Sequence, residues 1–71
     1  MLYPNLVWAM SNRRLPNYRV ATLAELSESS FSRAVAGRRD FSPEERERIA
    51  KVLGFPAAWL FAEPRPPRVG A

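Results

Sequence analysis

The chain has 71 residues, of which 46% are hydrophobic, and eleven basic against seven acidic side chains give it a net charge of +4. It contains neither cysteine nor histidine, which excludes disulfides, thiolate or histidine metal ligands and histidine general-base catalysis. We therefore expect one small domain with no metal, no cofactor and no enzymatic activity. The basic charge makes an anionic partner the first hypothesis, nucleic acid before a membrane surface.

Hydrophobic spacing and helix-end residues predict an all-α domain of five short helices over residues 1–62. The first helix is expected at residues 6–15, because the residue before Pro16 avoids the helical conformation. The second is expected at residues 18–25, with Asn17 as its N-cap.

The third and fourth helices have the clearest end signals. Ser27 is the expected N-cap of a helix at residues 28–36, and Gly37 follows its end. Ser42-Pro43-Glu44-Glu45 combines a serine N-cap, a proline at the first helical position and a glutamate at the third, which is a capping box. Two oppositely charged pairs, each spaced four residues apart, are expected on the outer side of this fourth helix: Glu44 with Arg48, and Glu47 with Lys51.

The C-terminal part of the chain is expected to divide into a short helix and a tail. Gly54 ends the fourth helix, and the last helix is expected at residues 56–61. Residues 63–71 contain three prolines and are expected to form a disordered tail. No apolar run approaches the roughly 20 residues needed to span a membrane.

One pattern spans the second and third helices: Ala21-x-x-x-Glu25-Leu26-Ser27-x-x-x-Phe31-Ser32-Arg33-Ala34-x-x-Gly37. A small residue at Ala21 lets two steeply crossing helices touch, and Phe31 fills the angle between them. Together with its flanking segments, over residues 5–62, this pattern resembles the helix-turn-helix domain of the phage lambda repressor/Cro-like family, also called the xenobiotic-response-element family. Two positions depart from the family, since Glu25 replaces a glycine in the turn and Asn17 replaces a glutamine. A left-handed glutamate costs about 1 kcal/mol, so the turn is either strained or built differently.

The resemblance implies binding to double-stranded DNA, with the third helix as the recognition helix in the major groove. Arg33 suits a bidentate contact with guanine, whereas Glu28 either accepts a hydrogen bond from cytosine or only stabilises the helix N-terminus. The base-reading positions carried over from the family are Glu28, Ser29, Ser32 and Arg33. The positions expected at the DNA backbone are Asn17, Arg19, Ser27, Arg38 and Arg39.

Three aromatic residues are candidates for contacts with a partner. Trp8 either packs with Tyr3 or lies in an interaction patch. Trp59 and Phe61 belong either to the core or to a protein contact. One recognition helix reads only a few base pairs, so we expect a weak homodimer that pairs on DNA. These three aromatic side chains are the candidates for that contact.

We therefore expect a sequence-specific transcriptional regulator, a phage-related, Cro-like repressor that acts by operator occupancy in the cytoplasm and is associated with the nucleoid. Two alternatives remain open. The helix-turn-helix fold can serve as a protein-interaction module with weak or no DNA binding, which Glu28 and the exposed aromatics favour. Alternatively, the chain is the DNA-binding part of an antitoxin-like pair, with residues 63–71 as the partner segment.

Overall fold

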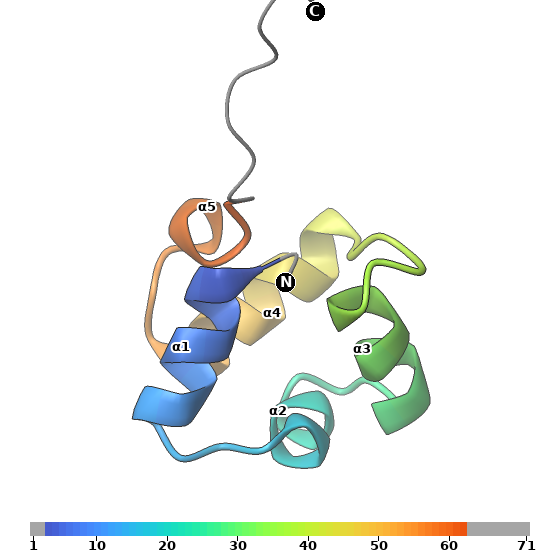
Figure 1. Ribbon diagram of the computed structural model, residues 1–71, viewed down its shortest axis with the longest axis horizontal. Coiled ribbons are helices and arrows are strands. Elements are labelled where there is room, and N and C mark those ends of the chain that lie inside the picture. Colours follow the sequence, from blue (N-terminus) through green and yellow to red (C-terminus); the bar gives the residue numbers. More distant parts are fainter. Residues whose placement is uncertain (1–2, 63–71) are drawn as a thin grey trace, which may run out of the picture.

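The computed structural model describes residues 3–62, which form five α-helices and no strand within that range (Figure 1). The helices are α1 (Pro4–Asn12), α2 (Asn17–Leu23), α3 (Glu28–Val35), α4 (Pro43–Leu53) and α5 (Ala57–Leu60). The predicted all-α class and the number and order of the helices are confirmed. The tail expected at residues 63–71 lies outside the described residues.

The first helix is displaced toward the N-terminus relative to the predicted range. Pro4 occupies the first turn of α1, where a backbone N–H would have no partner inside the helix and its absence costs nothing. The helix ends at Asn12, because Arg14 adopts a left-handed φ of +57°. The predicted end at Leu15 is therefore wrong, and the helix stops well before Pro16.

The predicted helix caps differ in outcome. The N-cap position of α2 belongs to Pro16, and no side chain caps this helix, so the Asn17 cap is a wrong prediction. At α3, Ser27 Oγ accepts a hydrogen bond from the N–H of Ser30 at 3.1 Å, which confirms the predicted cap. Gly37 follows α3 with a φ of +85°, as expected for a glycine after a helix end.

The capping box at the start of α4 is confirmed. Ser42 Oγ accepts from the Glu45 N–H at 3.1 Å, and Glu45 Oε1 accepts from the Ser42 N–H at 2.9 Å. The helix ends at Gly54, whose φ is +79°. These bonds satisfy donors that an uncapped helix end would leave without protein partners.

The ion pairs predicted along α4 are wrong. Neither Glu44–Arg48 nor Glu47–Lys51 forms, and the ion pair found within residues 3–62 is Arg39–Glu45. Arg48 instead donates its Nε–H to the carbonyl of Ala24 at 2.9 Å. This bond ties α4 to the end of α2, a tertiary contact that spacing along one helix cannot indicate.

Aromatic rings fill the centre of the domain. Phe31 has no exposed surface and meets Phe41 with ring centroids 5.7 Å apart, as expected for a wedge beside α2. Tyr3 and Phe61 complete the group, with centroids 5.5 Å apart. Phe61 is therefore a core residue and not a partner contact, and Tyr3 packs inside the domain and not with Trp8. The other buried side chains are Leu6, Ala9, Met10, Val20, Ala21, Ala24, Ala34, Ile49, Leu53 and Leu60.

The helices are arranged so that α1 and α5 lie on one side of the domain and α3 on the other (Figure 1). In that view α2 is seen nearly end-on and α3 from its side, so the two cross steeply. α2 packs against both α3 and α4, and α5 packs against α1 and α4. The outer surface of α3 is consequently left uncovered by any other helix of the domain.

Candidate nucleic-acid interface

The outer face of α3 presents short polar side chains and one cation. Burial of Phe31 and Ala34 fixes the rotation of the helix, and 100° per residue places Ser29, Ser32 and Arg33 on the opposite side. Ser29 and Arg33 are exposed and Ser32 is half-buried. None of these three side chains bonds to another side chain or carbonyl within residues 3–62. They are therefore available to a ligand.

Glu28 lies in the first turn of α3, exposed and beside this face. The positive end of the helix dipole stabilises a carboxylate there, which is one of the two roles considered for it. The same charge stands next to the serines that a polyanion would approach. Its position is thus compatible with either role.

The turn between α2 and α3 has a defined hydrogen-bonded form. The Leu26 N–H donates to the carbonyl of Ala21 at 2.7 Å, and the Glu25 N–H donates to that of Thr22 at 3.1 Å. Glu25 has a left-handed φ of +63°. This is a Schellman motif with glutamate at the position that usually holds glycine. The turn is therefore strained rather than differently built.

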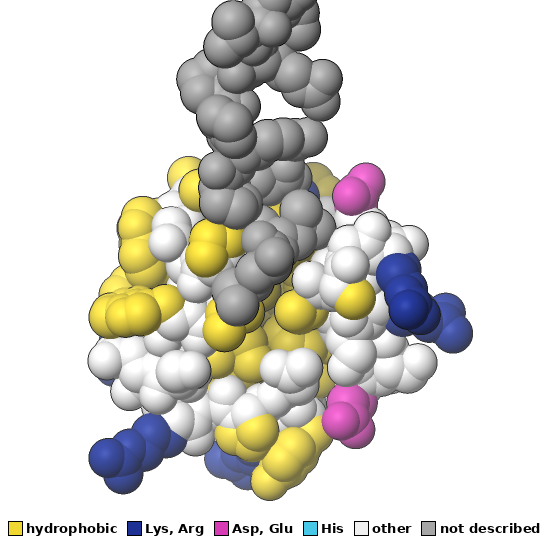
Figure 2. Space-filling model, viewed as in Figure 1, with side chains coloured by type: hydrophobic (Ala, Val, Ile, Leu, Met, Phe, Trp, Pro, Cys, Tyr) yellow, Lys and Arg dark blue, Asp and Glu magenta, His cyan; other side chains and the backbone are white. Residues whose placement is uncertain are grey.

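The arginines of residues 3–62 fall into two groups. Four of them donate their Nε–H to a backbone carbonyl: Arg13 to Leu53 at 3.0 Å, Arg39 to Ser30 at 3.1 Å, Arg46 to Phe41 at 3.3 Å and Arg48 to Ala24 at 2.9 Å. The other cations in that range are exposed and have no such bond: Arg14, Arg19, Arg33, Arg38 and Lys51. Figure 2 shows Lys or Arg side chains at the edge of the molecule beside α3.

Arg39, predicted at the DNA backbone, is engaged inside the domain. Besides Ser30, it donates to the carbonyl of Asp40 at 2.8 Å and to both carboxylate oxygens of Glu45 at 3.1 and 3.2 Å. Its guanidinium lies 5.8 Å from the ring centre of Phe41. Arg39 thus fastens the loop after α3 to the start of α4, and we remove it from the expected phosphate contacts.

The same network changes the acidity of Glu45. Burial alone would raise its pKa, but the hydrogen bonds from Arg39 and from the Ser42 N–H, with the charges of Arg39 and Arg48, outweigh burial and lower that pKa below the ordinary value for glutamate. Glu45 is therefore ionised at neutral pH, and its charge holds Arg39 in place.

The start of α2 adds exposed groups on a second element. Asn17 and Arg19, both predicted at the DNA backbone, are exposed, and so is Ser27 before α3. Between the first two lies Tyr18, whose side chain is 55% exposed and which the sequence analysis missed. The signal was present, because burial of Val20 and its neighbours turns Tyr18 outward on the same helix.

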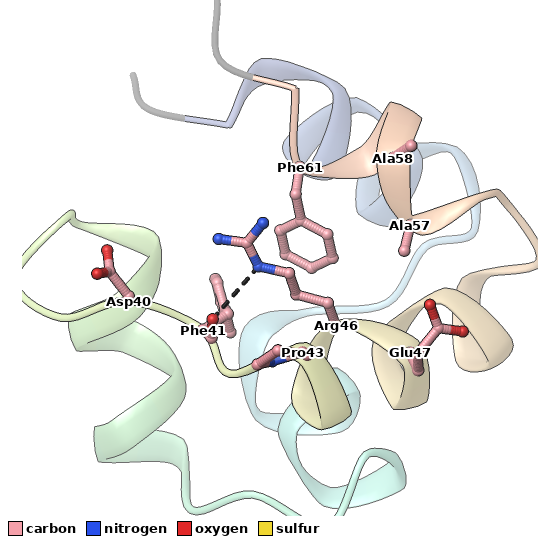
Figure 3. Close-up of a pocket in the computed structure, with 8 residues that line it drawn as sticks. All are labelled: Asp40, Phe41, Pro43, Arg46, Glu47, Ala57, Ala58 and Phe61. Atoms are coloured by element: carbon pink, nitrogen blue, oxygen red, sulfur yellow. Dashed lines mark hydrogen bonds between the residues drawn. The ribbon is translucent and has the colours of Figure 1, made fainter.

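A cleft of about 600 Å³ lies away from α3, between α4, α5 and the loop before α4 (Figure 3). Arg46 crosses it, 5.3 Å from the ring centre of Phe61. The described lining offers two carboxylates and this one guanidinium, without a hydroxyl, thiol or imidazole: Asp40, Phe41, Pro43, Arg46, Glu47, Ala57, Ala58 and Phe61. The side chains on its walls therefore assemble no nucleophile with a base.

Within residues 3–62, no cluster of acidic side chains is suited to hold a metal ion. No helix in this range is long and apolar enough to cross a membrane. Comparison with protein-family models and with curated proteins gave no match. The functional interpretation is consequently based on the geometry of α2 and α3 and on the exposed cations beside them.

Proposed function

We propose that this protein binds double-stranded DNA by placing the outer face of α3 in the major groove, as a sequence-specific transcriptional regulator of the lambda repressor/Cro-like kind. One observation carries the proposal. Ser29, Ser32 and Arg33 lie together on the uncovered side of α3 and have no partner among the described residues. A helix fits the major groove of B-DNA, where base edges can be read by such groups.

Each side chain of this face has a defined capacity for readout. The Arg33 guanidinium can donate two parallel hydrogen bonds to O6 and N7 of one guanine. The hydroxyls of Ser29 and Ser32 can donate or accept, so they suit more than one base. Arg33 is consequently the main determinant of sequence preference, and the serines adjust it.

The exposed cations near α2 and α3 supply the contacts to phosphate. Arg19 lies in the first turn of α2 and Arg38 directly after α3, and both lack an internal bond. Tyr18, Asn17 and Ser27 can add neutral hydrogen bonds to phosphate oxygens. Such contacts fix the position of the protein on the duplex and carry no sequence information.

The turn before α3 supports the resemblance to the lambda repressor/Cro-like family. The family usually has glycine in this turn, and here Glu25 adopts the left-handed conformation that glycine favours. Glu25 adopts this conformation although glutamate disfavours it, and the turn therefore has the shape that sets the angle between α2 and α3. That angle sets how far α3 projects from the domain.

The regulator is proposed to repress by occupancy, because a protein bound at an operator excludes the polymerase. Selection of bound duplexes from a random pool, followed by mobility shift, tests the binding. We expect a consensus of two related half-sites about 10 base pairs apart, or a multiple of that spacing, since two copies are needed for a specific site. The absence of any enriched sequence, with no binding at low salt, would overturn the proposal.

A protein-interaction module is the second candidate function. The carboxylate of Glu28 beside α3 and the exposed rings of Trp8 and Trp59 favour it. A mobility shift at low salt distinguishes the two functions. A folded protein that shifts no duplex under these conditions does not bind DNA through the cations around α3, and this result would favour the protein-interaction module. An antitoxin-like protein would bind both DNA and a protein partner, so it would shift a duplex and also be captured by that partner.

A further inference from the structure

The cleft between α4, α5 and the loop before α4 is acidic. Asp40 and Glu47 bring two carboxylates to it against one guanidinium, although the chain as a whole has a net charge of +4. Both acidic residues are exposed, and neither carboxylate forms a hydrogen bond or an ion pair within residues 3–62. Both are therefore available to a basic segment.

The guanidinium and the rings of the cleft belong to the domain itself. Arg46 donates its Nε–H to the carbonyl of Phe41 at 3.3 Å and lies 5.3 Å from the ring centre of Phe61. The two phenylalanine rings form the floor, with centroids 5.0 Å apart. Figure 3 shows Asp40 and Glu47 on opposite sides of the Arg46 side chain. Small apolar groups complete the lining: Pro43, Ala57 and Ala58.

The nine residues after the described part of the chain have a sequence that complements this cleft. They begin two residues after Phe61 and read Glu63-Pro64-Arg65-Pro66-Pro67-Arg68-Val69-Gly70-Ala71. Three prolines within four residues favour polyproline II, which has three residues per turn and a rise of about 3.1 Å. Pro64 and Pro67 then share one edge of the segment. Arg65 and Arg68 share the neighbouring edge, with their Cα atoms about 9 Å apart along it.

We propose that residues 63–71 bind in this cleft of their own chain. The proline edge then covers the apolar floor, as polyproline II segments do in other aromatic-lined grooves. The arginine edge faces the carboxylates of Asp40 and Glu47 on either side. Nine residues span about 28 Å in this conformation, so the segment can run along the cleft from its start near Phe61. Binding in the cleft orders a segment for which composition alone predicts disorder.

The covalent link between segment and cleft makes weak contacts sufficient. Exposed ion pairs contribute little by themselves, but a tethered segment has an effective concentration in the millimolar range. A proline-rich segment also loses little conformational entropy when it binds. The same segment of a second copy lacks the advantage of the tether, and the phosphates of DNA would be repelled by the carboxylates of the cleft. The chain's own residues 63–71 are therefore the favoured occupant.

Nuclear magnetic resonance of the full chain without DNA tests this inference. We expect backbone order parameters above about 0.6 at Arg65 and Arg68, since lower values mark a flexible segment. Overhauser contacts should join Pro67 to the methyl group of Ala58 or to the ring of Phe41. Both signals should stay unchanged on about tenfold dilution, because the contact lies within one chain. Salt at about 0.5 M should lower the order parameters by screening the ion pairs.

A matched pair of substitutions on α4 locates the contact. Glu47→Arg replaces a carboxylate of the cleft with a cation and should reduce the ratio of bound to free segment by about threefold or more. Glu44→Arg makes the same change at an exposed glutamate outside the cleft lining, and it should leave this ratio within about twofold of wild type. Circular dichroism melting checks that both variants fold.

An exchange of charges between segment and cleft provides a second test. Arg65→Glu combined with Arg68→Glu should reduce the ratio of bound to free segment by about tenfold or more, because two attractive pairs become repulsive. Adding Asp40→Arg and Glu47→Arg to this variant restores pairs of opposite charge and should recover most of the binding. Loss of fold cannot produce such a recovery.

Any of three results would overturn the inference. The first is order parameters below about 0.6 throughout residues 63–71 at low salt, and the second is an equal effect of Glu47→Arg and Glu44→Arg. The third is order that rises with protein concentration, which would assign the contact to the segment of a second copy. Because the assay contains no DNA, its failure leaves the DNA-binding proposal untouched. Conversely, a chain that binds no duplex can still hold this segment in the cleft.

Discussion

Arg39 and Glu45 form two parallel hydrogen bonds, from the two terminal guanidinium nitrogens to the two carboxylate oxygens, at 3.1 and 3.2 Å. The guanidinium also holds the carbonyl of Ser30 in α3, and the carboxylate also holds the N–H of Ser42 at the start of α4. One ion pair therefore links the first turn of α3 to the start of α4.

This pair makes stability depend on pH. The pKa of Glu45 is lower in the folded chain than its ordinary value of 4.5, so its contribution to stability is present above that value and is lost as pH falls through the lower folded value. Denaturant titrations should show wild type losing stability between about pH 5 and pH 3. Glu45→Gln should cost about 1 kcal/mol at pH 7 and flatten this part of the profile. Glu44→Gln, at an exposed neighbour outside the ion pair, should leave the profile as in wild type.

Arg39 and its neighbour Arg38 should behave in opposite ways when replaced. Arg39→Ala removes the guanidinium that donates to the Ser30 carbonyl and to both oxygens of the Glu45 carboxylate, and it should reduce the free energy of unfolding by about 1–3 kcal/mol. Arg38→Ala removes an exposed cation without an internal bond and should change it by less than about 0.5 kcal/mol. Equal effects in thermal or urea unfolding would contradict the division of the arginines into bonded and available groups.

Phe31 should be the most sensitive core position tested. Its ring is fully buried against Phe41, and Phe31→Ala should cost about 3–5 kcal/mol, a large part of the stability of so small a domain. Leu23→Ala removes a side chain that is 49% exposed and should cost much less. Circular dichroism melting measures both variants, and an unchanged melting temperature for Phe31→Ala would mean that α3 is rotated differently.

Short-range signals predicted most of the fold, because their partners lie within a few residues. The serine caps of α3 and α4 bond to N–H groups three residues away, so local rules suffice. Arg48 bonds to a carbonyl 24 residues away and Arg13 to one 40 residues away, and no local pattern encodes such contacts. Arg39 was placed with the available cations for a different reason: its partners are only one, six and nine residues away, but they lie on both sides of the loop between α3 and α4, which the spacing of a single helix does not describe.

Backbone strain was the second limit on prediction. Arg14 and Glu25 both adopt left-handed φ values, which side chains other than glycine disfavour. Propensity alone extends both helices through these positions, and this is why α1 and α2 were predicted too long. The end of α3 has the same pattern of hydrogen bonds as the end of α2, but its left-handed position is occupied by Gly37, for which this conformation is favourable. The end of α3 was accordingly predicted to within one residue.

Glu25→Gly should accordingly stabilise the domain. Relief of the left-handed conformation is worth about 1–2 kcal/mol, and the added freedom of glycine in the unfolded chain returns about 0.5–1 kcal/mol. We expect a net gain of about 0.5–1 kcal/mol in urea denaturation. Glu28→Gly, in the first turn of α3 where no left-handed φ is needed, should instead destabilise by about 1 kcal/mol. A loss of stability in Glu25→Gly would show that Glu25 makes a favourable contact that offsets its strain.

Arg33, Arg38 and Lys51 together test the DNA face, because all three are exposed cations without an internal bond and carry the same charge at different positions. Arg33→Ala should weaken binding to the selected site by about 1–3 kcal/mol and relax the preference at one base. The reason is that its guanidinium can form both hydrogen bonds only with the correct base. Arg38→Ala should weaken binding to all duplexes alike and reduce the slope of log affinity against log salt by about one, because one phosphate contact is lost. Lys51→Ala removes the same charge from α4 and should change neither quantity. If the three variants lose affinity equally and without a change in base preference, the protein attracts DNA only through its net charge, and α3 is not the reading element.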